Sequence, residues 1–366
     1  MLDVLPNRPR KGRGAVSNRT GRFEAQERVA IHDGWDFTPS PELIDTDPAQ
    51  APRTTLSVDN AKRIIARNKS PDVPFDRSIN PYRGCEHGCI YCFARPTHAY
   101  YGLSPGMDFE TKLFHKPNAP ELLAEELRKP GYVPATLALG TNTDPYQPVE
   151  RSEKLTRRIL QVLADFKHPF SIVTKSPLVV RDLDIIQPMA AQGLAQVSIS
   201  VTTLDRTIAR KMEPRAPSPQ KRIDAIAALS KAGVPTAVLA APMIPALNDS
   251  ELEAILDAAH TAGATGAGYI LLRLPLEIRD LFVEWLHANF PDRANHVMSL
   301  VRDTRGGADY RSGWGSRMSG TGPYAALLKR RFDMAQKRLG LNARWRELDC
   351  EKFAPPPRPG DQLALF

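Results

Sequence analysis

Three cysteines lie close together in one short stretch of the chain. Cys85, Cys89 and Cys92 follow a C-x3-C-x2-C spacing, and the fourth cysteine, Cys350, lies far away in the sequence. Three thiolates on one loop can hold three irons of a cubane [4Fe–4S] cluster and leave the fourth iron open. Because an open iron can bind a small molecule, the spacing predicts a catalytic centre rather than a simple electron carrier.

A structural zinc site and a disulfide framework are the other uses of such cysteines. Zinc sites usually combine two Cys pairs, or a Cys pair and a His pair, so His87, His98 or His115 would have to supply a nitrogen here. Disulfide-rich domains are smaller and denser in Cys. Gly84 and Gly88 permit the backbone bends that bring three sulfurs together, which favours the cluster. A zinc-binding, non-catalytic nucleic-acid module stays open as an alternative.

Composition is that of a soluble globular enzyme. The chain has 366 residues, 42% hydrophobic and 25% charged, with a net charge of +8. This basic excess permits an anionic partner such as nucleic acid without demonstrating one. The sequence contains neither an apolar stretch long enough to span a membrane nor the apolar core of a secretory signal. We therefore expect no membrane association and a cytoplasmic location.

Apolar, β-branched runs alternate with helical periodicity over the central part of the chain. The expected strands are 78–82, 136–140, 170–174, 196–201, 236–240 and 269–273. The expected helices are 121–128, 152–166, 178–192, 219–232 and 249–262. Such alternation predicts an α/β fold with a parallel sheet, as a doubly wound sheet or as a barrel. In both folds ligands bind at the carboxyl ends of the strands, where the cysteine loop is expected.

The cysteine loop, with Tyr91 directly before the third cysteine, resembles the signature of the radical S-adenosylmethionine (SAM) enzymes. The stretch 213–234 resembles the matching segment of the SplB-like bacterial branch, which is related to spore photoproduct lyase. The resemblance implies a partial (β/α)6 barrel of the TIM type and a [4Fe–4S] cluster on Cys85, Cys89 and Cys92. It also implies that the open iron binds SAM and that reduced flavodoxin or ferredoxin supplies the electron that cleaves SAM to a 5′-deoxyadenosyl radical.

By the same resemblance, the ends of the second and third expected strands supply SAM contacts. Asn142, Thr143 and Asp144 can offer acceptors to the SAM ammonium group, and Lys175 can pair with its carboxylate. An ordinary helix-start turn and a solvated lysine at the rim are the competing interpretations of these residues.

Later strand ends complete the predicted SAM site. Ser198 and Ser200 lie two residues apart, on one face of a strand, and their hydroxyls suit a ribose or a purely structural bond to backbone. Arg210 and Glu213 are candidates for contact with SAM or substrate, against charge at a helix start. Met243 fits a wall beside the adenine, although core packing would look the same.

One departure from spore photoproduct lyase concerns the hydrogen-atom donor. That enzyme uses an additional cysteine in the barrel, whereas this chain has none between Cys92 and Cys350. Cys350 would have to fold back, or a tyrosine such as Tyr146 would have to substitute. The substrate therefore stays open between a nucleic acid and a peptide or small molecule, as do the hydrogen abstracted, the consumption or regeneration of SAM and the oligomeric state.

Composition also suggests a division of the chain. Residues 1–60, rich in Pro, Arg and Gly, predict a flexible basic arm; residues 61–300 predict the core domain, and residues 301–366 a helical C-terminal extension. Within the extension, the Gly- and Arg-rich stretch 311–322 carries Trp314. We expect this stretch to be either a loop over the substrate, with Trp314 available for stacking, or a surface connector.

Overall fold

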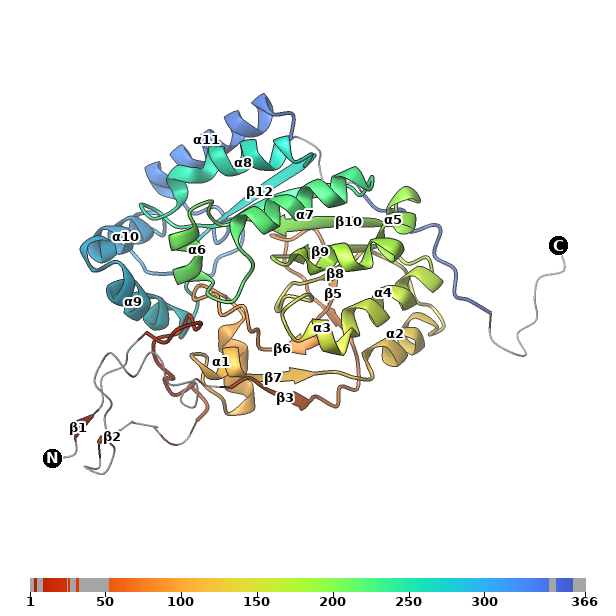
Figure 1. The fold of residues 1–366 in the computed structure, drawn as a ribbon, viewed down its shortest axis with the longest axis horizontal. Helices are drawn as coiled ribbons and strands as arrows, with labels where there is room; N and C mark the ends of the chain where they lie inside the picture. Colours follow the sequence, from red (N-terminus) through yellow and green to blue (C-terminus); the bar gives the residue numbers. More distant parts are fainter. Residues whose placement is uncertain are drawn as a thin grey trace.

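The computed structural model describes residues 3–4, 9–24, 26, 31–32, 53–341 and 347–357, and all structural statements below refer to these residues. A seven-stranded sheet with the order β12-β11-β10-β9-β8-β5-β4 forms the centre of the molecule (Figure 1). Its strands are β4 (Ile65–Arg67), β5 (Arg77–Ile79), β8 (Leu137–Leu139), β9 (Phe170–Thr174), β10 (Ala195–Ser200), β11 (Thr236–Met243) and β12 (Gly266–Leu271). The strands from β5 to β12 pair in parallel, and β4 pairs antiparallel with β5.

The helices follow the strands in the expected alternation. They are α1 (Asp108–Thr111), α2 (Ala119–Leu127), α3 (Glu150–Glu153), α4 (Leu155–Asp165), α5 (Leu183–Ala191), α6 (Arg206–Met212), α7 (Pro219–Lys231), α8 (Leu252–Thr261), α9 (Ile278–Asn289), α10 (Pro291–Asp303) and α11 (Gly322–Arg338). Three 3-10 helices are η1 (Arg95–Tyr101), η2 (Pro177–Asp182) and η3 (Asp249–Glu251). The predicted α/β fold with six parallel βα steps is confirmed. Among the described residues β12 has no pairing with β4 or β5, so the barrel is partial.

Two sequence expectations need correction in detail. The helix expected at 152–166 is broken at Lys154, whose φ of 50° is left-handed, so α3 and α4 replace it. The strand expected at 78–82 ends at Ile79, after which the chain turns and forms β6 (Tyr82–Arg83). That turn carries the chain away from the large sheet directly before the cysteine loop.

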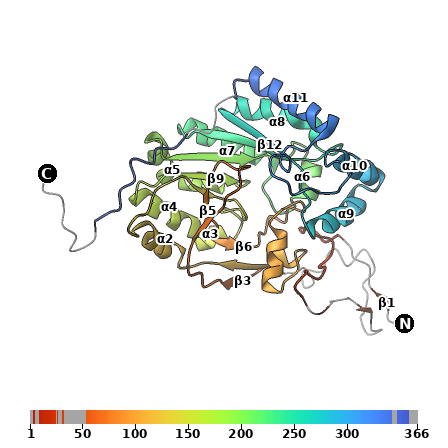
Figure 2. The same ribbon diagram turned by 180° about the vertical axis from the view of Figure 1, so that it is seen from behind.

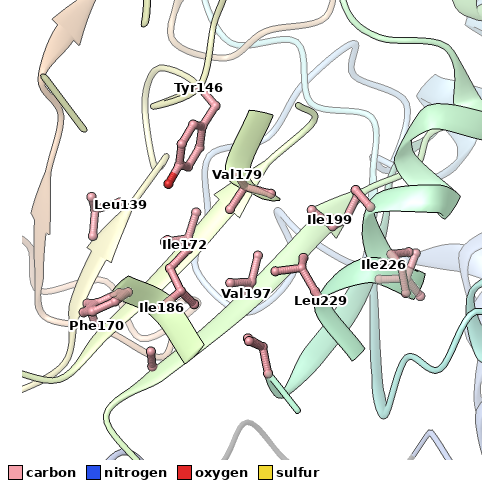
Figure 3. Packing of buried hydrophobic residues seen from close by; sticks show 14 of the residues in the cluster. Leu139, Tyr146, Phe170, Ile172, Val179, Ile186, Val197, Ile199, Ile226 and Leu229 are labelled. Carbon is pink, nitrogen blue, oxygen red and sulfur yellow. The ribbon is translucent and has the colours of Figure 1, made fainter. Parts of the chain in front are cut away.

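β10 shows how the sheet separates core from site. Every residue of β10 is buried. Val197 and Ile199 pack toward Ile226 and Leu229 of α7, as Figure 3 shows. Because side chains alternate along a strand, Ser198 and Ser200 point to the opposite, inner face. Apolar side chains therefore fix the sheet to its helices, while polar side chains face the interior of the partial barrel.

Smaller elements complete the molecule. A second sheet contains β3 (Thr55–Val58), β7 (Lys112–His115) and β6 in the order β3-β7-β6, and a two-residue pair joins β1 (Asp3–Val4) to β2 (Ile31–His32). Both views of the ribbon show α11 beside α8, and α9 and α10 near α6 (Figures 1 and 2). None of the described helices combines the length and the apolar character that crossing a membrane requires. The boundaries of the three predicted parts of the chain stay predictions.

Candidate active site

The cysteine loop connects β6 to η1 and is folded by two left-handed glycines. Gly84 has a φ of +72° and Gly88 a φ of +68°. A Cβ atom on Gly84 would lie 2.8 Å from the Phe109 carbonyl oxygen, so no larger residue fits there without displacing backbone. The amide of Cys85 donates to the same Phe109 oxygen at 3.0 Å, and the amide of Cys92 donates to the Cys89 carbonyl at 3.2 Å. The loop is therefore a compact structure rather than a free turn.

The three thiols of the loop form a donor set of the kind that holds a [4Fe–4S] cluster with one open iron. Cys85 and Cys89 are buried and Cys92 is partly exposed. Burial raises the pKa of all three thiols, and the Cys85 thiol also feels the charges of Cys89 and Cys92. Within the described residues, no three His, Cys, Asp or Glu side chains are gathered closely enough to hold one metal ion.

A buried ion pair behind the loop was missed by the sequence analysis. Arg95 is fully buried, and its guanidinium donates to the carbonyls of Gly88 and Cys89 at 3.1 and 2.9 Å. The same group contacts the carboxylate of Glu110, also fully buried, at 2.5 Å. These bonds hold the backbone of the loop at the second cysteine. No local spacing marks either residue, because their meeting depends on α1 packing under the loop.

Residues 13–17, which we name the N-terminal strap, lie against the cysteine loop. All five are buried, which corrects the expectation of a flexible arm for this segment. The amides of Gly14 and Ala15 donate to the two oxygens of Glu110 at 2.9 and 2.8 Å. A Cβ atom on Gly14 would lie only 1.8 Å from the carbonyl oxygen of Gly88. The carboxylate of Glu110 therefore holds the strap directly and holds the cysteine loop through Arg95.

Asp144 links the loop after β8 to the cysteine loop. Its carboxylate accepts from the Lys175 amide at 2.8 Å and from the Thr174 hydroxyl at 2.6 Å, and lies 3.4 Å from the His87 ring. Burial alone would raise the pKa of Asp144, but His87 and these hydrogen bonds lower it to about 2. Asp144 therefore stays ionised and holds the ends of β8 and β9 beside the cysteine loop. Its predicted contact with the SAM ammonium stays a prediction.

A second polar network surrounds Lys175. Its ammonium group donates to the Ser200 hydroxyl at 2.6 Å, lies 3.5 Å from a Glu213 oxygen and sits 5.6 Å from the centre of the Tyr91 ring. Burial lowers the pKa of Lys175. Glu213, itself buried, also accepts from the Tyr91 hydroxyl and from the Arg222 guanidinium. Four predicted site residues from four segments, Tyr91, Lys175, Ser200 and Glu213, thus meet beside the cysteines.

Asn142 and Thr143 lie at the same rim with different exposure. Asn142 is exposed, and its amide donates to the side-chain oxygen of Asn80 at 2.9 Å. Thr143 is buried, and its hydroxyl donates to the Tyr82 carbonyl at 3.0 Å. The side chain of Thr143 thus braces the approach to the cysteine loop.

The remaining residues that were predicted to contact SAM include buried and exposed side chains. Ser198 is fully buried, and its hydroxyl has no hydrogen-bond partner among the described residues. Met243 is fully buried at the end of β11. Arg210 is exposed on α6, and the structure does not bring it into the network around Lys175. Their contacts with SAM stay predictions.

The two candidate hydrogen-atom donors make their hydrogen bonds away from the three thiols. The amide of Asp349, next to Cys350, donates to the Gly193 carbonyl at 3.1 Å, directly before β10. This segment lies at the amino ends of the strands, away from α6 and α1 (Figure 1). The Tyr146 hydroxyl is buried and donates to Asp182 at 3.0 Å.

The chain is similar in sequence to known proteins. The family model of the radical SAM superfamily matches residues 79–259. An uncharacterised protein of Mycobacterium tuberculosis is 40% identical over 242 residues, which cover 65% of this chain and 71% of that protein. An uncharacterised protein of Methanocaldococcus jannaschii is 31% identical over 191 residues, covering 52% and 68% of the two chains.

Solved structures show the same fold. A mutant of spore photoproduct lyase with bound AdoMet and dinucleoside spore photoproduct has a TM-score of 0.54 and 13% identity, covering 78% of this chain and 79% of that chain. Spore photoproduct lyase complexed with dinucleoside spore photoproduct gives a TM-score of 0.55 at 14% identity, with the same coverage. At this identity the likeness concerns the fold alone.

Proposed function

Because this chain belongs to the radical SAM superfamily, we propose that it cleaves SAM reductively at a [4Fe–4S] cluster on Cys85, Cys89 and Cys92 to abstract hydrogen from a substrate. The observation that carries the proposal is the buried cysteine loop at the carboxyl ends of the strands, beside the network around Lys175. A bound cluster with SAM would supply an electron and a 5′-deoxyadenosyl radical. The residues of the protein itself would position the ligand, supply charges around it and shield it from solvent.

The residues around the loop suit a zwitterionic ligand. Lys175 offers a cation within a largely buried network, and Ser200 offers a hydroxyl at the same point. A carboxylate bound there would take the place of weaker contacts to Lys175, such as the 3.5 Å approach of Glu213. The unpartnered hydroxyl of Ser198, on the same face of β10, supports the proposal that this residue contacts a ribose oxygen.

Nucleic acid is the substrate class we propose first. The support is the net charge of +8 and the fold shared with spore photoproduct lyase, which has been solved with dinucleoside spore photoproduct. A peptide or small molecule is the alternative. The position of Cys350 at the amino ends of the strands favours a reaction other than thymine-dimer repair, because this fourth cysteine does not stand beside the other three to return a hydrogen atom. Reduced flavodoxin or ferredoxin is the proposed electron donor.

The test uses anaerobically reconstituted protein with dithionite and SAM. We expect about four irons and four sulfides per chain and formation of 5′-deoxyadenosine. Cys89→Ala should lose both, whereas Cys350→Ala, a matched change of a free thiol at the other end of the strands, should keep both. One zinc per chain, with no iron and no SAM cleavage, would instead support the non-catalytic binding module. Salt-sensitive binding of DNA or RNA then separates the two substrate classes.

A further inference from the structure

Arg273 stands at the same rim as the cysteine loop but belongs to neither network described above. It lies two residues beyond the carboxyl end of β12. Its guanidinium carbon is 5.3 Å from the centre of the Phe93 ring. Phe93 directly follows Cys92 and is 45% exposed. Arg273 therefore lies beside the cysteine loop, next to an aromatic ring that is open to solvent.

The guanidinium of Arg273 has only weak protein partners. One terminal nitrogen lies 3.5 Å from the Met318 sulfur and the other 3.4 Å from the Tyr310 hydroxyl. The Nε atom is buried and has no hydrogen-bond partner among the described residues. No Asp or Glu carboxylate of the described residues comes within 4.0 Å of the group. Within those residues the guanidinium therefore has no counter-charge in direct contact.

A second arginine adds positive charge behind it. Arg305 is buried, and its terminal nitrogens donate to the carbonyls of Leu272 and Ser316 at 2.7 and 3.0 Å. Its Nε also lacks a partner within the described residues, and no carboxylate there pairs with it. Burial lowers the pKa of Arg305, and the charge of Arg273 acts in the same direction. The two guanidiniums are therefore close enough to repel each other.

Arg305, which is buried, and Arg273, which is partly buried, differ from three other buried arginines of the described residues. Arg77 binds Asp76, Arg95 binds Glu110 and Arg222 binds Glu213. Buried charges are normally paired in this way, because an isolated buried charge is costly. Two neighbouring arginines without a carboxylate at a ligand-binding rim indicate that the missing anion comes from outside the chain.

We propose that Arg273, supported by Arg305, binds an oxyanion of the substrate, a phosphate or a carboxylate. The inference rests on the proposed function, which makes this rim the mouth of the active site. Phe93 offers a flat apolar surface beside the anion, for a base or another apolar group. The loop 311–322 joins the subsite through Met318 and Ser316 and carries Trp314, which is 64% exposed. Arginine suits both oxyanions, because its planar fork can donate two parallel bonds.

The test measures anion binding apart from SAM cleavage. Reconstituted, SAM-loaded protein is titrated by calorimetry with inorganic phosphate and, separately, with acetate, in low-chloride buffer. Arg273→Gln removes the charge, Arg273→Lys keeps it without the fork, and Arg293→Gln, at an exposed site on α10, is the matched control. We expect binding of at least one anion, about ten-fold weaker in Arg273→Gln, intermediate in Arg273→Lys and unchanged in Arg293→Gln. Preference for phosphate or for acetate identifies the type of oxyanion.

Three results would overturn the proposal. They are no binding of either anion to the wild-type protein, equal binding to the wild type and to Arg273→Gln, and loss of 5′-deoxyadenosine formation in Arg273→Gln alone, which would place the arginine in the SAM site. Cluster absorbance reports whether each variant is folded and loaded, and Arg273→Lys keeps the test valid if the Gln variant does not fold. Anion binding that depends on Arg273 in a protein that never cleaves SAM would leave the subsite standing and refute the proposed function.

Discussion

At the scale of single residues, Glu213 is the centre of the network beside the cysteines. One carboxylate accepts from Tyr91 and Arg222 and lies 3.5 Å from the ammonium of Lys175. All four groups are buried or nearly so. Removing the negative charge would leave two cations in a poorly solvated place, which costs far more than an exposed ion pair.

Glu213→Gln is therefore expected to lower the free energy of unfolding by about 3 kcal/mol, because Arg222 and Lys175 lose their counter-charge. The same substitution at the exposed Glu125 should change the free energy of unfolding by less than about 0.5 kcal/mol. Urea unfolding of the two variants under anaerobic conditions measures both values. Equal free energies of unfolding for the two variants would show that the charge of Glu213 does not stabilise the fold by the expected amount.

At the scale of elements, the N-terminal strap and the cysteine loop form one unit around Glu110. The strap contributes two backbone amides, and the loop is joined through Arg95. Gly14 is the closest approach of the two segments. The strap covers the backbone between Cys85 and Cys89 and, in the proposed function, shields the cluster from water and oxygen.

Gly14→Ala tests this unit. Its Cβ atom would lie 1.8 Å from the Gly88 carbonyl oxygen, so we expect the strap to be displaced and the cluster to be lost in air several-fold faster. Gly313→Ala is the matched control, since its Cβ atom would meet nothing closer than 3.9 Å. The decay of cluster absorbance after exposure to air gives both rates. Identical decay in the two variants would mean that the strap does not protect the cluster.

The same elements show what local sequence can and cannot predict. The strand at Phe170–Thr174 has the bounds expected from its apolar, β-branched run, because burial between helices dictates that pattern. The strap was expected to be flexible, because its Arg- and Gly-rich composition is typical of unpacked chain. It is held by backbone amides and by the absence of a side chain at Gly14, and hydrophobic periodicity records neither feature.

The same limit applies to the candidate site: local sequence marks some of its residues, and only long-range contacts mark the others. The cysteines, Lys175 and Glu213 could be placed from a motif and from strand ends. Arg95 and Glu110 could not, because their sequence neighbourhood looks like an ordinary solvated surface. Arg273 has no carboxylate partner among the described residues, and only the folded chain shows which residues lie near it.

At the scale of the whole molecule, the two ends of the strands have separate tasks. The carboxyl ends carry the cysteine loop, while the segment 347–357 packs against the amino ends. There the ring of Phe353 lies 5.4 Å from that of His168, and the Tyr132 hydroxyl lies 2.8 Å from His168. This segment stabilises the fold at a distance from the chemistry.

Stability should depend on the pH through His168. Burial lowers its pKa from 6.5 to about 4. Below 6.5 the unfolded chain takes up a proton that the folded chain does not, so stability falls as the pH drops toward 4, by roughly 3 kcal/mol in total. His168→Gln should lose that part of the pH dependence, whereas His260→Gln, at an exposed site, should retain it. Urea unfolding above pH 6.5 and near pH 4 supplies the comparison, and an unchanged slope in His168→Gln would refute the assignment.

The central claim is that three cysteines hold a cluster whose fourth iron is open to SAM. The most direct measurement is electron paramagnetic resonance of the dithionite-reduced, reconstituted protein before and after SAM is added. We predict a reduced-cluster signal whose shape changes with SAM, because SAM binds the open iron. A signal that SAM leaves unchanged, or a protein that takes up zinc in place of iron, would contradict the claim.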